Sequence, residues 1–172
     1  MPATSPDPTF ELPIATSQGE FVAHYSDRGL TALNFPRSTT ALRRHPAIPK
    51  DLIQSISHWH RLTTRALKQA LAGRESAEWP PLDVVTGTDF QGRVWHALQK
   101  IPRGATSSYG AIARQIGRPK AVRAVGGACG AYPLPVVIPC HRVLAANGRL
   151  GGFSGGLDWK RRLLAAEGVT LI

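Results

Sequence analysis

The spacing of apolar residues divides the 172-residue chain near residue 86, with strand-like segments and one long helix before it and a series of short helices after it, and this division limits the fold more than any other feature. Before it, three segments show the partial alternation of apolar and polar residues that is typical of short strands: 10–16, 20–26 and 29–35. Turn-forming residues at 26–29 predict a hairpin between the last two segments. We therefore expect a small antiparallel sheet in the first half of the chain.

A longer apolar period follows the expected sheet. It predicts one long helix from about Pro49 to Leu71 and then a short strand over residues 82–86. Two segments are expected to be irregular: residues 1–9 and 36–48. Residues 1–85 thus form a candidate domain that offers no catalytic constellation of its own.

From residue 86 onward the spacing predicts short helices separated by glycine and proline. Thr88 and Gln91 form a capping-box pattern before the first helix, and Ser107 or Ser108 can cap the second. The expected helices are residues 89–100, 109–116, 120–131 and 157–166. Pro119 suits the first position of the third helix. A tight turn joins the second and third helices, so they form a helix-turn-helix pattern. The expected fold class is α/β in the broad sense (α+β), with residues 86–172 as a helical second domain.

The third expected helix is built from small residues, including Ala124, Gly126 and Gly127. Glycine lowers helix stability, yet a helix without bulky side chains can approach another surface closely. Arg123 stands out as its long side chain. Two interpretations stay open: the small residues let the helix approach DNA, or they let it pack against the protein core.

Basic residues are concentrated in the second half of the chain. Residues 86–172 hold 12 Lys or Arg against 3 Asp or Glu, whereas residues 1–85 hold 9 against 8. Positive charge segregated in this way favours a polyanionic partner, most often nucleic acid, over an ordinary basic surface.

Composition argues against several other classes of protein. Apolar residues make up 42% of the chain, its mean hydropathy is −0.13, and no apolar run is long enough to span a bilayer. Residues 1–6 lack a signal-peptide pattern, and two cysteines, Cys129 and Cys140, do not make a disulfide framework. We therefore expect a cytoplasmic, bacterial protein without a membrane partner. No cysteine–histidine spacing matches a zinc site, and His58 and His60 do not share a helix face.

A thiol, an imidazole and a guanidinium follow one another at Cys140, His141 and Arg142. They come directly after the apolar run 134–138, which predicts a buried strand. Cysteine attacks as the thiolate, and a neighbouring cation or proton acceptor lowers its pKa; an inert core cysteine is the alternative. Glu167 is the only glutamate after residue 78, and it is either a salt-bridge partner or a functional acid.

Several segments of the second half together resemble one family, the O6-alkylguanine-DNA alkyltransferases (methylated-DNA–protein-cysteine methyltransferases). They occur in the family's order and cover essentially all of residues 86–172, and the cysteine segment is the most specific. The segments are Gly87-Thr88-Asp89-Phe90-Gln91, Ile101-Pro102-Arg103-Gly104, Ser108-Tyr109-Gly110, Arg123-Ala124-Val125-Gly126-Gly127-Ala128, Pro139-Cys140-His141-Arg142-Val143, Gly152-Phe153-Ser154-Gly155-Gly156 and Glu167-Gly168.

The resemblance implies a protein that repairs DNA by direct reversal. Such a protein flips O6-alkylguanine, and also O4-alkylthymine, out of the duplex and transfers the alkyl group irreversibly to a cysteine. Each molecule therefore reacts once and needs no cofactor and no metal. The implied partner is double-stranded DNA, bound through its minor groove by a monomer that can bind cooperatively. The implied fold is a ribonuclease-H-like N-terminal domain and a winged-helix-like C-terminal domain.

The resemblance also implies a role for individual residues. Cys140 would accept the alkyl group, His141 would deprotonate it through a bound water, and Glu167 would orient the imidazole. Tyr109 would protonate the leaving guanine. The guanine pocket would be formed by Tyr109, Val143, Phe153, Ser154 and Trp95. The DNA-binding residues would be Arg123, which replaces the flipped base in the stack, with Ala124, Gly126, Gly127 and Ser108.

Three residues depart from the family's pattern. Tyr132 stands where the family usually has an asparagine that ties the recognition helix to the active-site loop, so this hinge must be built differently. Phe153 replaces a common tyrosine, and Cys129 matches no catalytic position, so we expect it to be inert packing. Two other functions stay as alternatives. They are a sensor of alkylated DNA, a class that lacks the acceptor cysteine, and a helix-turn-helix regulator.

Overall fold

The structure is a computed structural model that describes residues 9–36, 47–75, 78–84 and 87–171. These residues divide into two compact units, one ending at Lys68 and completed by residues 78–84, the other formed by residues 69–75 and 87–171. Most of the two segments expected to be irregular, and the expected domain boundary at 85/86, lie outside the described residues.

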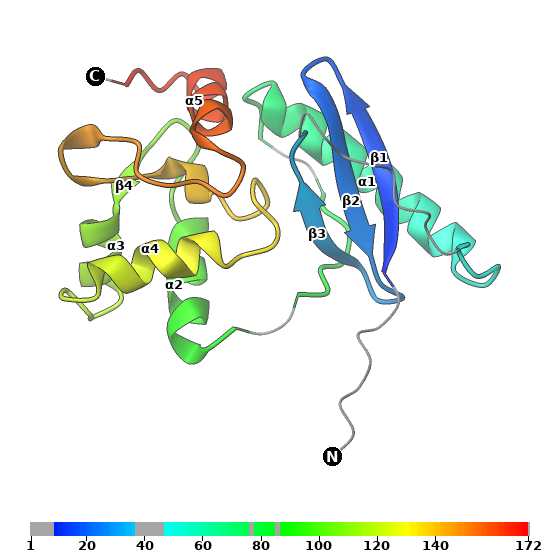
Figure 1. Cartoon of the computed structure of the whole chain (residues 1–172), viewed down its shortest axis with the longest axis horizontal. Coiled ribbons are helices and arrows are strands. Elements are labelled where there is room, and N and C mark those ends of the chain that lie inside the picture. The colour runs from blue at the N-terminus through cyan, green and yellow to red at the C-terminus, as the bar shows by residue number, and fades with distance from the viewer. Residues whose placement is uncertain (1–8, 37–46, 76–77, 85–86, 172) are drawn as a thin grey trace. The chain divides into compact units, whose positions relative to one another are not determined.

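The N-terminal unit is a three-stranded antiparallel sheet with one long helix (Figure 1). Its elements are β1 (Phe10–Thr16), β2 (Gly19–Tyr25), β3 (Leu30–Asn34) and α1 (Ile53–Leu71). Alternate strand residues such as Phe21 and Tyr25 are fully buried, as the period-2 pattern requires. The Tyr25 hydroxyl lies 3.2 Å from His60 Nδ1, which joins β2 to α1.

The sequence predicted these three strands and this helix to within a few residues, but the further strand over residues 82–86 was wrong. Among the described residues of that segment, only Leu82 pairs, in a single parallel bridge to Leu30. Asp83 instead accepts a hydrogen bond from the Ser26 hydroxyl at 2.6 Å.

The C-terminal unit is mainly helical and confirms the predicted α+β plan. Its elements are α2 (Asp89–Gln99), β4 (Ser107–Ser108), α3 (Tyr109–Gln115), α4 (Val122–Gly130), a 3₁₀ turn (Cys140–Arg142), β5 (Val143–Leu144), a second 3₁₀ turn (Ala146–Gly148) and α5 (Leu157–Ala166). The Thr88 and Gln91 side chains form the predicted capping box on α2. The Ser108 hydroxyl caps α3 by accepting from the Ala111 N–H at 3.0 Å.

Helices α3 and α4 form the predicted helix-turn-helix (Figure 1). Gly117, with a φ of +72°, lies just beyond the end of α3, where glycine is favoured. The prediction that Pro119 begins the next helix was wrong, because residues 118–121 form a further turn and α4 starts at Val122. Ala121 precedes α4 and caps it with no side-chain hydrogen bond.

The apolar run 134–138 is not the buried strand that the sequence predicted. Prolines at 133, 135 and 139 remove backbone N–H donors from the segment, which a ladder would need. Val136 adopts a φ of +78°, and the Ile138 N–H donates to the Leu134 carbonyl at 3.3 Å. The strand instead follows the cysteine, where β5 pairs in parallel with β4.

Candidate active site

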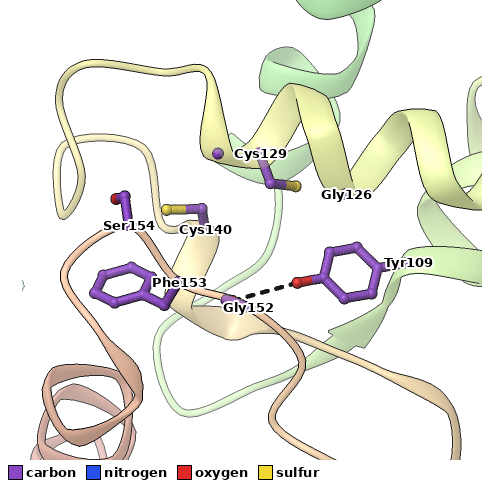
Figure 2. A pocket seen from close by; sticks show the side chains of 8 residues that line it. Tyr109, Gly126, Cys129, Cys140, Gly152, Phe153 and Ser154 are labelled. Atoms are coloured by element: carbon purple, nitrogen blue, oxygen red, sulfur yellow. Dashed lines mark hydrogen bonds between the residues drawn. The ribbon is translucent and has the colours of Figure 1, made fainter.

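A cavity of about 280 Å³ lies in the C-terminal unit, between α3, α4, the Cys140 turn and the glycine-rich loop (Figure 2). The structure therefore brings together four segments that are separated by up to 45 residues of sequence. The cavity is lined by Tyr109, Gly126, Cys129, Gly130, Cys140, Gly152, Phe153 and Ser154.

Cys140 opens the 3₁₀ turn and is 6% exposed. Burial raises the pKa of its thiol to about 11, although the charge of Lys160 and the N–H groups of Cys140 and His141 act in the opposite direction. The group is therefore a neutral thiol at pH 7. To react as a thiolate, it needs a base that removes its proton.

His141 and Glu167 form a buried pair beside this thiol. His141 Nε2 lies 2.9 Å from Glu167 Oε1, and the two side chains are 2% and 7% exposed. Burial raises the pKa of Glu167, but hydrogen bonds from His141 and Arg142 outweigh it and lower this pKa to about 2. An ionised carboxylate can only accept hydrogen bonds, so the His141 proton lies on Nε2 and Nδ1 keeps a free lone pair. Burial lowers the pKa of His141, which keeps the imidazole neutral, and a neutral imidazole can accept a proton.

Arg142 holds the carboxylate in place. Its Nε donates to Glu167 Oε2 at 2.9 Å and its Nη2 donates to Glu167 Oε1 at 2.8 Å, which is the bidentate geometry that arginine favours. Its Nη1 donates to the Ile101 carbonyl at 2.7 Å. Glu167 lies at the C-terminal end of α5, where the helix dipole disfavours a negative charge. The arginine and the histidine stabilise a carboxylate that the helix alone would not favour.

Tyr109 forms the opposite wall of the cavity, at the first position of α3 (Figure 2). Its hydroxyl donates to the Gly152 carbonyl at 3.4 Å, a long hydrogen bond. Burial raises the pKa of Tyr109, so the phenol keeps its proton at pH 7 and can donate it.

Lys160 is a site residue that the sequence interpretation missed. Three basic residues follow one another in α5, and Arg161 and Arg162 are exposed whereas Lys160 is not. Lys160 is fully buried, and its Nζ donates to the Val143 carbonyl at 2.5 Å and the Gly152 carbonyl at 3.1 Å. Burial lowers the pKa of its ammonium to about 8. The sequence does contain a signal for this burial. Lys160 lies three and four residues before Leu163 and Leu164, and this spacing places it on the apolar face of α5.

Cys129, expected to be inert packing, lines the cavity from α4.

Two residues assigned to the guanine pocket lie elsewhere. The Trp95 indole N–H donates to the Ala128 carbonyl at 2.8 Å, and its ring packs edge-on against Tyr132 with centroids 4.9 Å apart. Val143 is fully buried and its carbonyl accepts from Lys160. Neither residue is among those that line the described cavity, whereas Tyr109, Phe153 and Ser154 are.

The residues assigned to DNA binding lie on or beside the helix-turn-helix. Arg123, Ala124 and Gly127 are exposed on α4, and Arg118 and Lys120 are exposed in the turn before it. A Cβ atom built on Gly127 would meet no other atom within 4 Å, so packing against the protein core does not require glycine there. Ser108 is half-buried as the cap of α3. The open position at Gly127 favours the interpretation that α4 approaches an external surface.

Other kinds of site find no support in the described residues. They contain no cluster of three or more His, Cys, Asp or Glu side chains that could hold a metal ion. None of the helices in the described ranges combines the length and the apolar character that crossing a membrane requires.

Comparison with known proteins agrees with the geometry of the site. The family model for the 6-O-methylguanine DNA methyltransferase DNA-binding domain matches residues 89–169. The methylated-DNA–protein-cysteine methyltransferase of Methanosarcina acetivorans is 39% identical over 162 residues, which are 92% of this chain and 96% of that protein. The chain belongs to the methylated-DNA–protein-cysteine methyltransferase family.

Other members of the methylated-DNA–protein-cysteine methyltransferase family match a shorter part of the chain at higher identity. The protein of Mycolicibacterium paratuberculosis is 60% identical over 81 residues, so the aligned region spans 47% of this chain and about half, 49%, of that relative's length. Among solved structures, Mycobacterium tuberculosis OGT in complex with DNA superposes with a TM-score of 0.68 at 38% identity, covering 90% of each chain. Members of this family transfer an alkyl group from O6-methylguanine to a cysteine in DNA repair.

Proposed function

We propose that the chain repairs O6-alkylguanine in double-stranded DNA by transferring the alkyl group to Cys140. The observation that carries this proposal is the buried Cys140 thiol in a cavity, next in sequence to a histidine whose protonation state is fixed by Glu167. A nucleophile, its base and an orienting carboxylate are the arrangement expected of an activated cysteine.

The reaction starts with removal of the thiol proton. In the proposed path a water molecule relays that proton from Cys140 to His141 Nδ1, the buried nitrogen for which the described residues offer no hydrogen-bond partner. Glu167 stabilises the imidazolium that forms, because it stays ionised, and Arg142 holds this carboxylate in position. The base and its orienting carboxylate, with the nearby charge of Lys160, together offset the high pKa that burial gives the thiol.

The thiolate then attacks the alkyl carbon. A C–S bond forms, the bond between that carbon and O6 breaks, and the electron pair passes into the guanine ring. Tyr109 donates its hydroxyl proton to the leaving base and is reprotonated by solvent as the base departs. Because no group in the cavity can cleave a thioether, each molecule reacts once. Phe153 and Ser154 line the cavity on the side of the glycine-rich loop and are suited to hold the guanine.

DNA is engaged through α4 in this proposal. A relative of 38% identity has been crystallised in complex with DNA, and the exposed small residues of α4 suit the narrow minor groove. Arg123 occupies the place of the flipped base, and O4-alkylthymine is a second substrate. The positive charge of residues 86–172 supplies affinity that does not depend on sequence and falls steeply with salt.

Mass spectrometry of the protein after incubation with a duplex that carries O6-methylguanine tests the proposal. We expect the mass of one methylene to be added, on the peptide that contains Cys140. C140S should bind the same duplex without any mass gain. Transfer to a different residue, or none in a folded, DNA-binding preparation, would contradict the assignment. The two alternative functions predict no gain in the mass of the protein. A sensor of alkylated DNA lacks an acceptor cysteine, and a helix-turn-helix regulator would bind DNA without transferring an alkyl group.

A further inference from the structure

One wall of the cavity comes from α4, and that wall carries a single side chain. Gly126, Cys129 and Gly130 face the cavity from this helix, with the spacing of three and four residues that places them on one face. Because two of the three are glycines, only the CH₂–SH group of Cys129 projects from this wall.

The Cys129 thiol shares the space in front of the acceptor thiol. Both side chains line the cavity, and Figure 2 shows them on adjoining segments, with their sulfurs directed to opposite sides in this view and the Tyr109 and Phe153 rings on the other sides of the cavity. A negative charge on either sulfur disfavours one on the other, as expected of near neighbours. Cys129 is 6% exposed, and burial raises the pKa of its thiol to about 12. Cys129 is therefore a neutral thiol at pH 7, and its side chain fills space in the cavity that it lines.

The position of the transferred group follows from the reaction. The alkyl carbon must touch Cys140 Sγ, so the rest of the alkyl group occupies cavity space beside that sulfur. Glycines at 126, 130 and 152 leave this space open, and Cys129 is the α4 side chain that takes up part of it.

We propose that the size of the Cys129 side chain sets the largest alkyl group that can be transferred to Cys140. This inference rests on the proposed function and adds a substrate range to it. A cysteine leaves more room than a longer side chain would, so the wild-type protein accepts groups larger than methyl. One methylene more or less in a tight apolar pocket changes discrimination by about 10- to 200-fold.

The test measures second-order transfer rates from one duplex sequence that carries O6-methyl-, O6-ethyl-, O6-butyl- or O6-benzylguanine. The quantity compared is the ratio of each rate to the methyl rate within the same variant, because DNA binding and general stability cancel in it. C129M should lower the benzyl-to-methyl ratio about tenfold or more, and C129A should raise it. C129S, which is close in size to the wild type, should leave the ratio unchanged and so separates size from thiol chemistry.

An unchanged benzyl-to-methyl ratio in C129M, with methyl transfer intact, overturns the inference. Should C129M fail to fold, C129A decides, since a ratio within twofold of wild type there overturns it as well. A changed ratio in C129S also overturns it, because it would show that the thiol itself matters. Failure of the proposed function looks different, because the wild-type protein would then transfer no alkyl group from any of the four duplexes.

Discussion

Replacing Glu167 with glutamine tests the charge on which the proposed mechanism depends. The carboxylate accepts from His141 at 2.9 Å and from Arg142 at 2.8 and 2.9 Å, and the Gly104 N–H approaches it at 3.3 Å. Glutamine keeps the size of the side chain but removes the charge and the titration. The variant therefore separates the ionised carboxylate from mere packing at that position.

The size of the effect follows from the pKa of Glu167. The pKa falls from an ordinary value of 4.5 to about 2 in the folded protein. The folded state thus favours the ionised form by about 3 kcal/mol, at 1.36 kcal/mol for each pKa unit. This pKa is depressed on folding, so the contribution is complete above pH 4.5 and is lost as the pH falls towards 2. Roughly 2 kcal/mol of it should be gone at pH 3.

Hydrogen exchange of the α5 amides, read by mass spectrometry, measures this contribution locally. A global melt would mix the two compact units of the chain. We expect wild type to exceed Glu167→Gln in opening free energy at pH 7, and this difference should shrink by about 2 kcal/mol at pH 3.

Asp158→Asn provides the matched control for that experiment. Asp158 lies on the same helix, its side chain is 88% exposed, and it pairs with Arg161 at 3.1 Å. Its removal should cost no more than about 0.5 kcal/mol at either pH. A difference between wild type and Glu167→Gln that stays constant from pH 7 to pH 3 would refute the reasoning, because it would mean that folding does not depress the pKa of Glu167.

Two further replacements test other parts of the site. Lys160→Met removes the buried cation that lowers the pKa of Cys140, so the pH–rate profile of transfer to free O6-benzylguanine should move to higher pH; an unmoved profile would leave Lys160 with a purely structural role. Arg123→Ala removes an exposed side chain of α4 that lies outside the cavity lining, so it should slow repair of duplex DNA tenfold or more, as loss of a base-flipping contact worth a few kcal/mol implies. The rate with free O6-benzylguanine should stay unchanged, and equal slowing of both reactions would count against a role in base flipping.

Local patterns in the sequence were enough to predict most of the fold. Three features depend only on residues close together in sequence and can therefore be predicted from it. They are the alternation in residues 10–35, the capping box at Thr88 and the serine cap of α3. The predicted strand over residues 134–138 does not form, because its prolines remove backbone N–H donors that a ladder needs, whatever its apolar composition favours.

The site was predicted in part, and its misses have a common cause. The segments that carry Cys140, Tyr109 and Ser154 meet in one cavity, as the family resemblance implied. Trp95 was assigned to the guanine pocket, whereas its indole satisfies the Ala128 carbonyl near the end of α4. Such roles depend on which side chain faces a neighbour from a distant segment, and no local pattern encodes that.

The same contact involves Tyr132, which stands where an asparagine is usual in the family. Tyr132 is 7% exposed and packs edge-on against Trp95, and Trp95 in turn holds α4 through Ala128. An aromatic pair thus joins the recognition helix to the segment that leads into the Cys140 turn, in place of an amide's hydrogen bonds.

Helix α5 completes the site from the other end of the chain. Lys160 and Glu167 are seven residues apart, close to two helical turns, so one face of α5 delivers both to the Cys140 turn. Lys160 donates to the Val143 carbonyl and to the carbonyl of Gly152, which lines the cavity, and Glu167 accepts from His141. In the proposed mechanism, the reactivity of Cys140 therefore does not depend only on the five residues around it. It also depends on α5, a helix that follows the nucleophile in sequence and supplies both a cation and a carboxylate to a buried thiol.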